Sequence, residues 1–422
     1  MPNTIADNLQ RLVDAKTAIA SAITAKGGTV TTGDGFEAFP ADIAAIPSGG
    51  GGGDADTGKP VRFIDYDGAI VDSYTAAEFA ALTAMPSNPT HEGLIAQGWN
   101  WSLADAKTYV AKYGTLNIGQ MYITSDGRTR LYVRMQEGRL SPILKLYLNA
   151  NSELDIDWGD GSTHSTFSST SAGYKSEQHN YPSAGDYVVS IGVTSGSFVL
   201  QSSSSSVSTL FTAGKASEYS ADRGYLNSIE KVEIGSGVTS IGNNVFWYCI
   251  SLSQITIPEG ITSIGNSAFK YCSALSQIII PESVTSIGNN AFQYCYSLSQ
   301  IIIPEGVTSI KTTAFQYCYS LSQIIIPEGV TSIGNNAFSY CTSLSQITIP
   351  EGITSIGNSA FSSCYSAGYV KFKSQTPPTV SNSNAFSNLP TDCIIYVPSA
   401  ALSAYKSATN YPSSSTYTYV GY

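Results

Sequence analysis

The chain has 422 residues, of which 42% are apolar and only 12% are charged, and its formal net charge is -10. This length predicts roughly three domains, and the apolar content is enough to fill their cores, so a largely disordered chain is excluded. The acidic balance argues against nucleic acid or an anionic membrane as the partner, because both attract clustered Lys and Arg. The sequence has no apolar stretch of the roughly 20 residues that span a bilayer.

Residues 1–48 begin with apolar positions that alternate in steps of four and three, with one lysine in the series. This spacing predicts a short coiled coil, in which a polar core position helps to fix register. An amphipathic helix packed on its own domain is the alternative. We expect a helical attachment or oligomerisation module here, then a Gly-rich linker at 49–58. The oligomerisation candidates are Ile5, Leu9, Leu12, Lys16, Ile19 and Ile23.

Residues 59–134 are predicted to form a small α+β domain. Two strands flank the Asp67-Gly68 turn, and the sequence TAAEFAALTA then has a helical pattern. A hairpin around Asp126-Gly127 is expected to complete the domain. Trp99 is interpreted as a core residue, with a ligand platform as the alternative. The elements FIDYDG and GLIAQGWNW resemble small β-rich repeats of bacterial surface proteins and phage tail proteins.

Residues 135–205 alternate apolar and polar positions, which predicts an antiparallel β-sandwich. Three short motifs occur in order: DWGDGS at 157–162, HNY at 179–181 and GDYVV at 185–189. In their order and spacing they resemble the PKD-type immunoglobulin-like domain. That resemblance implies a spacer or adhesion-associated module without a catalytic site. A connector at 206–228 follows.

Three aspartates of this segment, Asp155, Asp157 and Asp160, raise the possibility of a calcium loop. The spacing does not fit an EF-hand, because Gly159 stands at the third ligand position and no glutamate closes the loop at residue 166. We therefore interpret these residues as turn formers between strands. No metal site or cofactor is expected.

The second half of the chain repeats with a period of 23 residues. Such a period is the signature of a solenoid, in which each unit buries its apolar face against the next. The residues that mark the register are Cys249, Cys272, Cys295, Cys318, Cys341 and Cys364, with Phe246, Phe269, Phe292, Phe315, Phe338 and Phe361.

The unit LSQITIPEGITSIGNSAFKYCSA strongly resembles the BspA-like leucine-rich repeat. The complete copies span 229–366, and 367–422 are expected to form a degenerate repeat and a C-terminal cap. One copy departs from the pattern, because Lys311-Thr312-Thr313 replaces Gly-Asn-Asn, and its turn is expected to be reshaped without breaking the solenoid. The fold class expected overall is a mainly β, multidomain chain with an N-terminal helix, a small α+β domain, a PKD-like sandwich and this solenoid.

The repeat cysteines lie between apolar neighbours, so we expect them to stack as a buried ladder of small hydrophobic side chains. Disulfides between adjacent rungs are the alternative, although parallel side-chain directions would strain them. Metal binding is disfavoured because the repeats contain no histidine.

Two outward-facing columns are the candidate receptor-binding residues. In the strands, alternation points one isoleucine and one glutamine per repeat outward, onto a sheet expected to be exposed; plain β-propensity explains the isoleucines equally well. Beside the cysteines, tyrosine and serine resemble the chemistry of antibody paratopes, with simple stacking ladders as the alternative. The candidates are Ile279, Ile302, Ile325, Gln277, Gln300, Gln323, Tyr294, Tyr296, Tyr317 and Tyr319.

No catalytic constellation is recognisable, because the three histidines of the chain lie far from the repeat cysteines. We therefore expect a non-enzymatic binding protein. The leading hypothesis is a phage tail (fibre or receptor-binding) protein in the virion, contacting other tail proteins and a bacterial surface protein or glycan for host recognition. The absence of a secretory signal pattern at the N-terminus favours it. The alternative is a bacterial cell-surface adhesin that binds a host or neighbouring-cell protein or glycan. Intracellular scaffolds and injection-system components also remain open.

Overall fold

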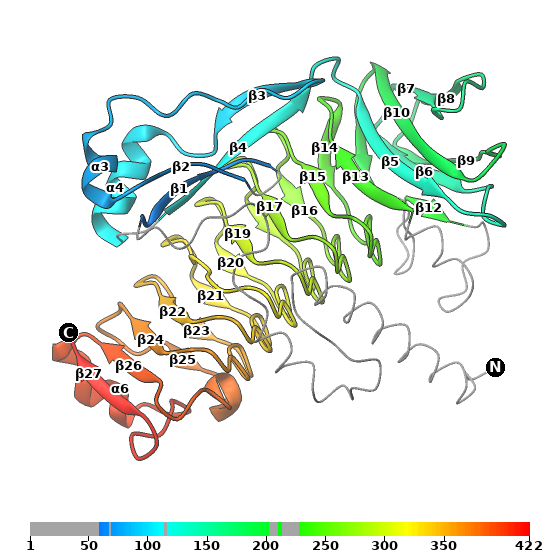
Figure 1. Ribbon diagram of the computed structural model, residues 1–422. Helices are drawn as coiled ribbons and strands as arrows, with labels where there is room; N and C mark the ends of the chain where they lie inside the picture. Colours follow the sequence, from blue (N-terminus) through cyan, green and yellow to red (C-terminus); the bar gives the residue numbers. More distant parts are fainter. Residues whose placement is uncertain (1–58, 67–68, 114–115, 202–209, 213–227) are drawn as a thin grey trace, which may run out of the picture.

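The computed structural model describes residues 59–66, 69–113, 116–201, 210–212 and 228–422 (Figure 1). The N-terminal helix, its six oligomerisation candidates, the Gly-rich linker and most of the connector lie outside these residues. The described part is mainly β, with few helices. It comprises a small α+β domain, two facing sheets and a long solenoid.

The small domain is a four-stranded sheet in the order β2-β1-β4-β3, with two helices. As predicted, β1 pairs antiparallel with β2 and a helix follows. Thr75 caps that helix, because its Oγ1 accepts from the Glu78 backbone N–H while the Glu78 carboxylate accepts from the Thr75 N–H. The interpretation of Trp99 as a core residue is confirmed, since its ring packs edge-on against Phe63 at 4.8 Å. The elements are β1 (Val61–Ile64), β2 (Ile70–Tyr74), α3 (Ala76–Ala81), β3 (Leu94–Trp99), α4 (Leu103–Tyr113) and β4 (Leu116–Thr124).

The prediction of a hairpin around Asp126-Gly127 is correct for the turn and wrong for the pairing of the two strands. The turn exists, with Gly127 at φ 70°, but β4 and β5 (Thr129–Met135) do not pair with each other. Instead, β5 pairs antiparallel with β10 over seven residues and with β13 on its other side. The two strands therefore belong to different sheets, and the turn joins the small domain to the next one.

Residues 129–200 form two facing sheets whose inward residues alternate along each strand. The residues of the three sequence motifs meet here: the rings of Trp158 and His179 stack at 4.5 Å, His179 Nε2 lies 2.7 Å from Asp160 Oδ2, and the Tyr181 hydroxyl donates to the Trp158 carbonyl. The PKD resemblance itself stays a prediction. The strands are β6 (Ile143–Leu148), β7 (Ser152–Asp157), β8 (Ser165–Ser169), β9 (Gly173–Gln178), β10 (Gly185–Ser195), β11 (Phe198–Leu200) and β12 (Phe211–Thr212).

Both sheets of this sandwich continue into the solenoid. One runs β15-β13-β5-β10-β7-β8, and the other runs β12-β6-β11-β14-β16-β18 with β9 beside β6 (Figure 1). A single apolar core extends from Leu131 to Tyr419 without interruption. The sandwich thus pairs with the first strands of the solenoid, whose edges would otherwise be open.

The solenoid has two rows of parallel strands, and equivalent residues pair one repeat apart, as Ile278 does with Ile301. One row contains β13 (Ile229–Glu233), β15 (Gln254–Thr256), β17 (Gln277–Ile279), β19 (Gln300–Ile302), β22 (Gln346–Ile349), β24 (Tyr369–Phe372), β26 (Ile394–Val397) and β27 (Thr418–Gly421). The other contains β14 (Val238–Ile241), β16 (Ser263–Ile264), β18 (Ser286–Ile287), β20 (Ser309–Ile310), β21 (Ser332–Ile333), β23 (Ser355–Ile356) and β25 (Thr379–Val380).

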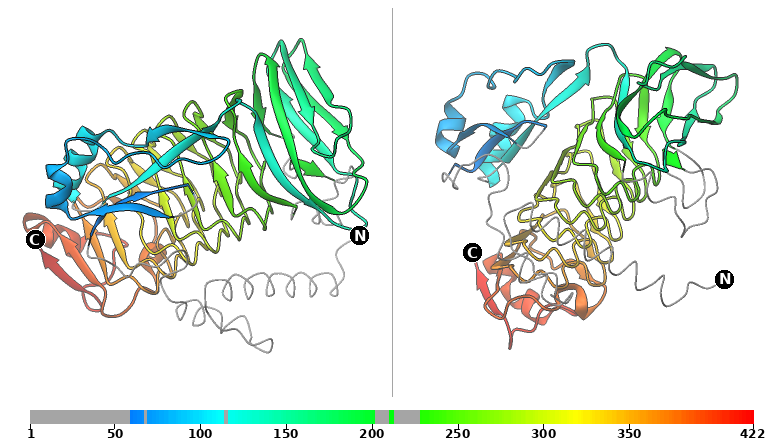
Figure 2. Two further views of the ribbon diagram at one scale, coloured as in Figure 1. Left: turned by 45° about the horizontal axis from the view of Figure 1, so that its top comes forward. Right: turned by 45° about the vertical axis from the view of Figure 1, so that its right-hand side comes forward.

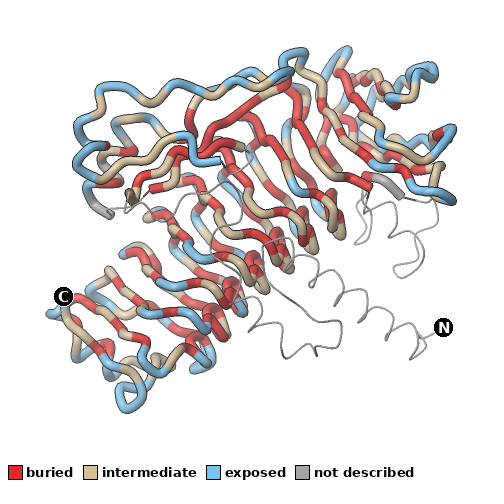
Figure 3. Tube along the Cα trace, viewed as in Figure 1, coloured by how far each residue is buried: buried red, intermediate tan, exposed pale blue. Residues whose placement is uncertain are grey.

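The interior of the solenoid is built from ladders of identical residues, and Figure 3 shows buried segments recurring in successive rungs. The six repeat cysteines and Cys393 are free and buried, which confirms the predicted ladder. The five repeat thiols from Cys272 to Cys364 each donate to a phenylalanine carbonyl of the preceding rung, as Cys295 does to Phe269 at 3.1 Å. Burial raises the pKa of the Cys295 thiol well above its usual range. The phenylalanines stack at 5.2 to 5.6 Å.

A third side of each rung consists of turns. In the six rungs from Asn244 to Ser363, each turn holds two residues with positive φ, such as Asn290 at 58° and Tyr294 at 64°. A bulky residue is uncommon in this conformation and persists only where its surroundings hold it. Backbone bonds to the next rung do so here, since the Tyr294 N–H donates to the Gln316 carbonyl at 2.9 Å. The Lys311-Thr312-Thr313 turn keeps this geometry, because Thr313 has φ 53° and its N–H donates to Asn335.

Residues 367–422 extend the two strand rows and then close them. The segment includes η1 (Ser383–Phe386), η2 (Ser399–Ala401) and α6 (Leu402–Ser407). Tyr405 of α6 is fully buried against Phe372, and its hydroxyl donates to the Ser374 carbonyl. The helix thus covers the apolar interior at this end of the solenoid.

Candidate binding surfaces of the repeats

The strand face of the solenoid carries the isoleucine and glutamine candidates, and the small domain covers much of it. The sequence predicted an exposed sheet here, but Ile279 is only 8% exposed and Thr256 is also buried. Ile302 is half-buried in β19, which contacts β4 of the small domain, and Ile325 packs on the core of that domain. Figures 1 and 2 show the small domain lying along the solenoid. The expected open isoleucine column is therefore an internal contact in this structure.

The contact is close and partly polar. A Cβ atom added to Gly119 of β4 would lie 2.7 Å from Cγ2 of Ile279, so only glycine allows this approach. The Gln277 amide donates to the Asp65 carbonyl at 2.8 Å. The Glu259 backbone N–H donates to the side-chain oxygen of Gln97. These bonds fix the position of the small domain over the repeats.

Two further glutamine candidates differ in their surroundings. The Asn117 side chain of β4 lies 3.5 Å from Oε1 of Gln300, at the long limit of a hydrogen bond. Gln323 is exposed. Gln277 and Gln300 thus face the small domain, whereas Gln323 is open to solvent, and a receptor role for any of them stays a prediction.

A row of glutamates follows the strands. The Oε2 atom of Glu282 accepts from the Glu305 backbone N–H at 3.1 Å, whereas its Oε1 is buried with no hydrogen-bond partner in the structure. Burial of Glu282, and the nearby carboxylates of Glu305 and Glu259, raise its pKa to about 7. This carboxyl group therefore changes its charge near neutral pH.

The turn face carries a tyrosine ladder, which we define as Tyr248, Tyr271, Tyr294, Tyr317 and Tyr340. Neighbouring rings are nearly parallel, at centroid distances from 4.1 Å to 4.8 Å. Tyr296 and Tyr319 stack on each other at 5.2 Å and stand edge-on to the ladder. The structure thus brings together the four tyrosine candidates of the sequence analysis.

The ladder is half-buried in its middle and more exposed at one end. Burial raises the pKa of Tyr271, Tyr296 and Tyr319 above the usual range, so these hydroxyls stay protonated at physiological pH. Tyr340 is 36% exposed and Tyr365 is 48% exposed. The sequence analysis did not select these two residues as candidates. The sequence does contain a signal for them, because serine replaces tyrosine at position 363, the next position of the column after Tyr340.

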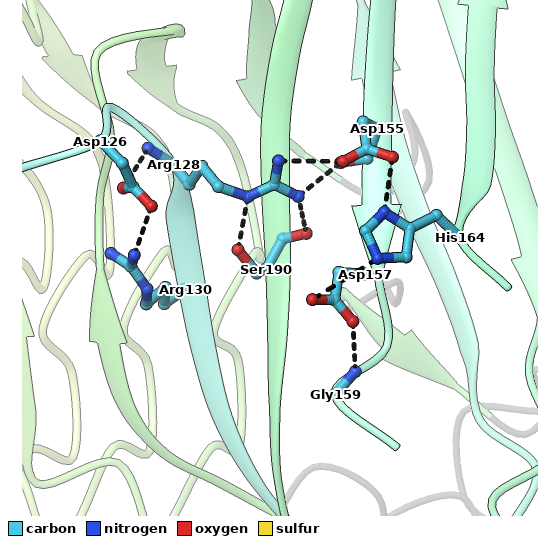
Figure 4. A network of polar contacts seen from close by, with 8 residues as sticks. All are labelled: Asp126, Arg128, Arg130, Asp155, Asp157, Gly159, His164 and Ser190. Carbon is cyan, nitrogen blue, oxygen red and sulfur yellow. Dashed lines mark hydrogen bonds and ion pairs between the residues drawn. The ribbon is translucent and has the colours of Figure 1, made fainter. Parts of the chain in front are cut away.

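The three aspartates that raised the question of calcium are engaged with basic partners and turn amides, and Figure 4 shows two of them, Asp155 and Asp157. Asp155 pairs with Arg128 and with His164, each at 2.9 Å. Asp157 accepts from the Gly159 N–H. The Arg128 guanidinium also donates to the hydroxyl and to the backbone carbonyl of Ser190. Arg128 lies in the turn after β4, so these bonds and its pair with Asp155 tie that turn to β10 and β7. The interpretation as turn residues holds for Asp157 and Asp160, whose carboxylates accept from the backbone N–H groups of Gly159 and Ser162. It is wrong for Asp155, which lies inside β7 and pairs with side chains of neighbouring segments.

Within the residues that the structure describes, no group of three or more His, Cys, Asp or Glu side chains is placed to hold a metal ion. None of the helices there is long and apolar enough to cross a membrane.

Comparisons with known proteins agree with the repeat architecture. The family model described as the BspA type leucine rich repeat region, in six copies, matches residues 224–345 and 308–411. No curated protein matches the chain significantly.

Among solved structures, a leucine-rich repeat protein from Bacteroides ovatus is 24% identical with a TM-score of 0.27, over 41% of this chain and 51% of that one. The T. pallidum leucine rich repeat protein is 24% identical with a TM-score of 0.27, over 44% of this chain and 84% of that one. A leucine rich cell surface protein from Faecalibacterium prausnitzii is 28% identical with a TM-score of 0.25, over 41% and 60%. The chain thus spans about half the length of the first of these proteins. Its residues 224–411 are a BspA-type leucine-rich repeat region folded as a β-solenoid.

Proposed function

We propose that the chain is a non-enzymatic binding protein that acts as a cell-surface adhesin and contacts a protein or glycan of a host or neighbouring cell through its turn face. The observation that carries the proposal is the tyrosine ladder. Its rings are held by stacking and by backbone bonds between rungs, so a partner meets a preformed aromatic surface and little side-chain freedom is lost on binding.

The surroundings of the ladder support an extracellular adhesive role. BspA-type repeats are typical of cell-surface and extracellular proteins. The acidic net charge of -10 disfavours polyanionic partners and leaves proteins and neutral glycans as the better-matched classes. The phage tail hypothesis depends largely on residues 1–48, which lie outside the described residues, so the virion location and the homo-oligomer stay predictions.

The test is binding of the fluorescently labelled full chain to bacterial and epithelial cells, measured by flow cytometry. The full chain is needed because the sandwich and the solenoid share two sheets and one core. A double variant, Tyr317→Ser with Tyr319→Ser, should reduce binding at least tenfold. Tyr174→Ser is the matched control, because Tyr174 is an exposed tyrosine of the sandwich, away from the repeats. Absence of binding to every cell type, or equal binding by folded double variant and wild type, would contradict the proposal.

A further inference from the structure

The second strand row of the solenoid, from β14 to β25, is interrupted at one point. One sheet ends with β18 and the next begins with β20, so these neighbouring strands do not pair. The turns beyond them stay bonded, since the Asn290 N–H donates to the Thr312 carbonyl at 3.0 Å and the Phe292 N–H to the Ala314 carbonyl at 2.8 Å. The two rungs therefore separate on this side, at the copy that carries Lys311-Thr312-Thr313.

The side chain at position 311 explains the interruption. The equivalent residue of the neighbouring rungs is glycine, and a Cβ atom added to Gly288 or Gly334 would lie 2.5 Å or 2.6 Å from a backbone nitrogen of the preceding rung. Lys311 has a Cβ atom, so its rung cannot approach Gly288 as closely. The Gly334 N–H donates to the Ile310 carbonyl at 2.8 Å, whereas the described residues hold no such bond from Lys311 to Ile287.

The interruption frees polar groups that are paired in other rungs. Asn266 Oδ1 accepts from the Asn289 N–H at 2.8 Å, and the same bond recurs elsewhere in the solenoid. Within the described residues this bond is missing between Asn289 and Thr312, because the rung of Thr312 lies further away. The side-chain oxygen of Asn289 and the backbone N–H of Lys311 are thus open to a ligand.

A cavity of about 280 Å³ lies at the interruption, and we call it the Lys311 groove. It extends from Asn289 over β20, β21 and β23. Its lining includes Ser309, Ser332 and Ser355, which are half-buried and pair one rung apart. Lys311 is exposed, is the only charged residue of the described lining, and has no described carboxylate in ion-pair contact. The groove is therefore locally positive on a chain whose net charge is -10.

We propose that the Lys311 groove binds one acidic sugar residue of a glycan. The lysine ammonium attracts the sugar carboxylate as a point charge, and the free N–H of the same residue is a further donor. The serine hydroxyls and the Asn289 amide can donate to and accept from the sugar hydroxyls. The volume of about 280 Å³ is near the lower bound of ligand pockets, ~300 Å³, and suits a single ring.

The lining favours a carboxylated sugar over other anionic ligands. A phosphate group carries about 1.5 to 2 negative charges near neutral pH, for which the described lining has a single cation. An acidic peptide would also bring apolar side chains, but Ile310 and Ile333 of the groove are buried and its exposed lining is polar. The groove lies on a different side of the solenoid from the tyrosine ladder, so this inference goes beyond the proposed function and does not depend on it.

The test titrates the full chain with methyl β-glucuronopyranoside and with the methyl glycoside of N-acetylneuraminic acid. Methyl β-glucopyranoside is the neutral counterpart of the first probe. Binding is followed by ligand-observed NMR and calorimetry, and at least one acidic sugar should bind at least tenfold more tightly than the neutral one. Lys311→Gln removes the charge and keeps a side chain at this position, so acidic-sugar binding should fall at least tenfold. Lys406→Gln is the matched control, because it removes an exposed lysine of α6 outside the groove and should leave affinity unchanged.

A second variant tests how the groove arises. Lys311→Gly restores the residue of the neighbouring rungs, so β18 and β20 should pair and acidic-sugar binding should again fall at least tenfold. Amide exchange at residue 311 should slow, because its N–H would then donate to Ile287 as that of Gly334 donates to Ile310. In Lys311→Gln this exchange should stay as fast as in the wild type. If Lys311→Gln does not fold, Lys311→Gly decides alone, since slowed exchange also shows that it is folded.

The proposal is overturned if neither acidic sugar binds, or if Lys311→Gln binds them like the wild type. It is also overturned if acetate or inorganic phosphate binds as tightly as the sugars, or if a tetraglutamate peptide alone binds. The double variant Tyr317→Ser with Tyr319→Ser should keep the sugar affinity of the wild type. Its cell binding tests the adhesin proposal separately, so either proposal can fail while the other stands.

Discussion

The strand face and the turn face of the solenoid repeat with the same period, yet they differ in what lies against them. On the strand face, β4 of the small domain approaches so closely that Gly119 can carry no side chain over Ile279. On the turn face, the tyrosines lie against one another and Tyr340 is partly open. Periodicity therefore reveals which residues point outward, whereas a distant segment of the chain decides which of them can meet a partner.

The two faces should respond together when their common core is damaged. Phe292 is fully buried between Phe269 and Phe315, so Phe292→Ala should lower the free energy of unfolding by about 3–5 kcal/mol, measured by urea denaturation. Phe292→Leu, which keeps more of the volume, should cost less. Amide exchange should speed up in β17, β19 and the tyrosine turns alike. Faster exchange on one face alone would show that the faces do not share this core.

The small domain should be separable from the strand face without harm to the turn face. Gly119→Val places methyl groups where Ile279 lies and should destabilise the contact by about 1–3 kcal/mol. Hydrogen exchange should then increase at β17 and leave the tyrosine turns unchanged. Gly173→Val is the control, since nothing lies within 4 Å of a Cβ there. Unchanged exchange at β17 would contradict a close contact.

The two faces should also differ in their response to pH. This effect should be smaller than the effects of Phe292→Ala and Gly119→Val. Burial first, and then neighbouring carboxylates, raise the pKa of Glu282 to about 7. A raised pKa in the folded state means that the neutral carboxyl favours folding, so its contribution is complete below the ordinary glutamate pKa and is lost as the pH rises through about 7. In the tyrosine ladder, burial raises the pKa of Tyr271, Tyr294 and Tyr317, which moves their titration further from this range.

Glu282→Gln should therefore flatten the fall in melting temperature between about pH 4.5 and 7. Glu351→Gln, at the same repeat position on an exposed residue, is the control and should leave the pH dependence unchanged. A pH dependence that survives in Glu282→Gln would assign it to another group.

The solenoid was predictable because identical residues recur at a fixed spacing, and each rung reproduces the bonds of the previous one. The buried cysteines and the tyrosine column follow from that register, as Cys295 and Tyr294 illustrate. The strand alternation was also predicted, since Ile255 and Ile257 point inward.

The covering of Ile279 was not predictable from the repeat, because its partner strand lies about 160 residues earlier and has no periodic relation to it. One signal was present: Gly119 lies in the interior of a strand, which is typical of a close backbone approach. The separation of β4 and β5 was missed because a turn motif reports local geometry, whereas the seven-residue pairing with β10 is a tertiary contact.

The uniform bonding between rungs leaves the number of rungs free to vary. Each turn binds the next through the same backbone atoms, and the rings of Phe292 and Phe315 are 5.5 Å apart. Duplication of one 23-residue unit after Ile325 would move the C-terminal cap away from the small domain by about that distance, with neither end altered. Gain or loss of whole units could thus change the reach of the protein by increments of one rung while its recognition chemistry stays the same.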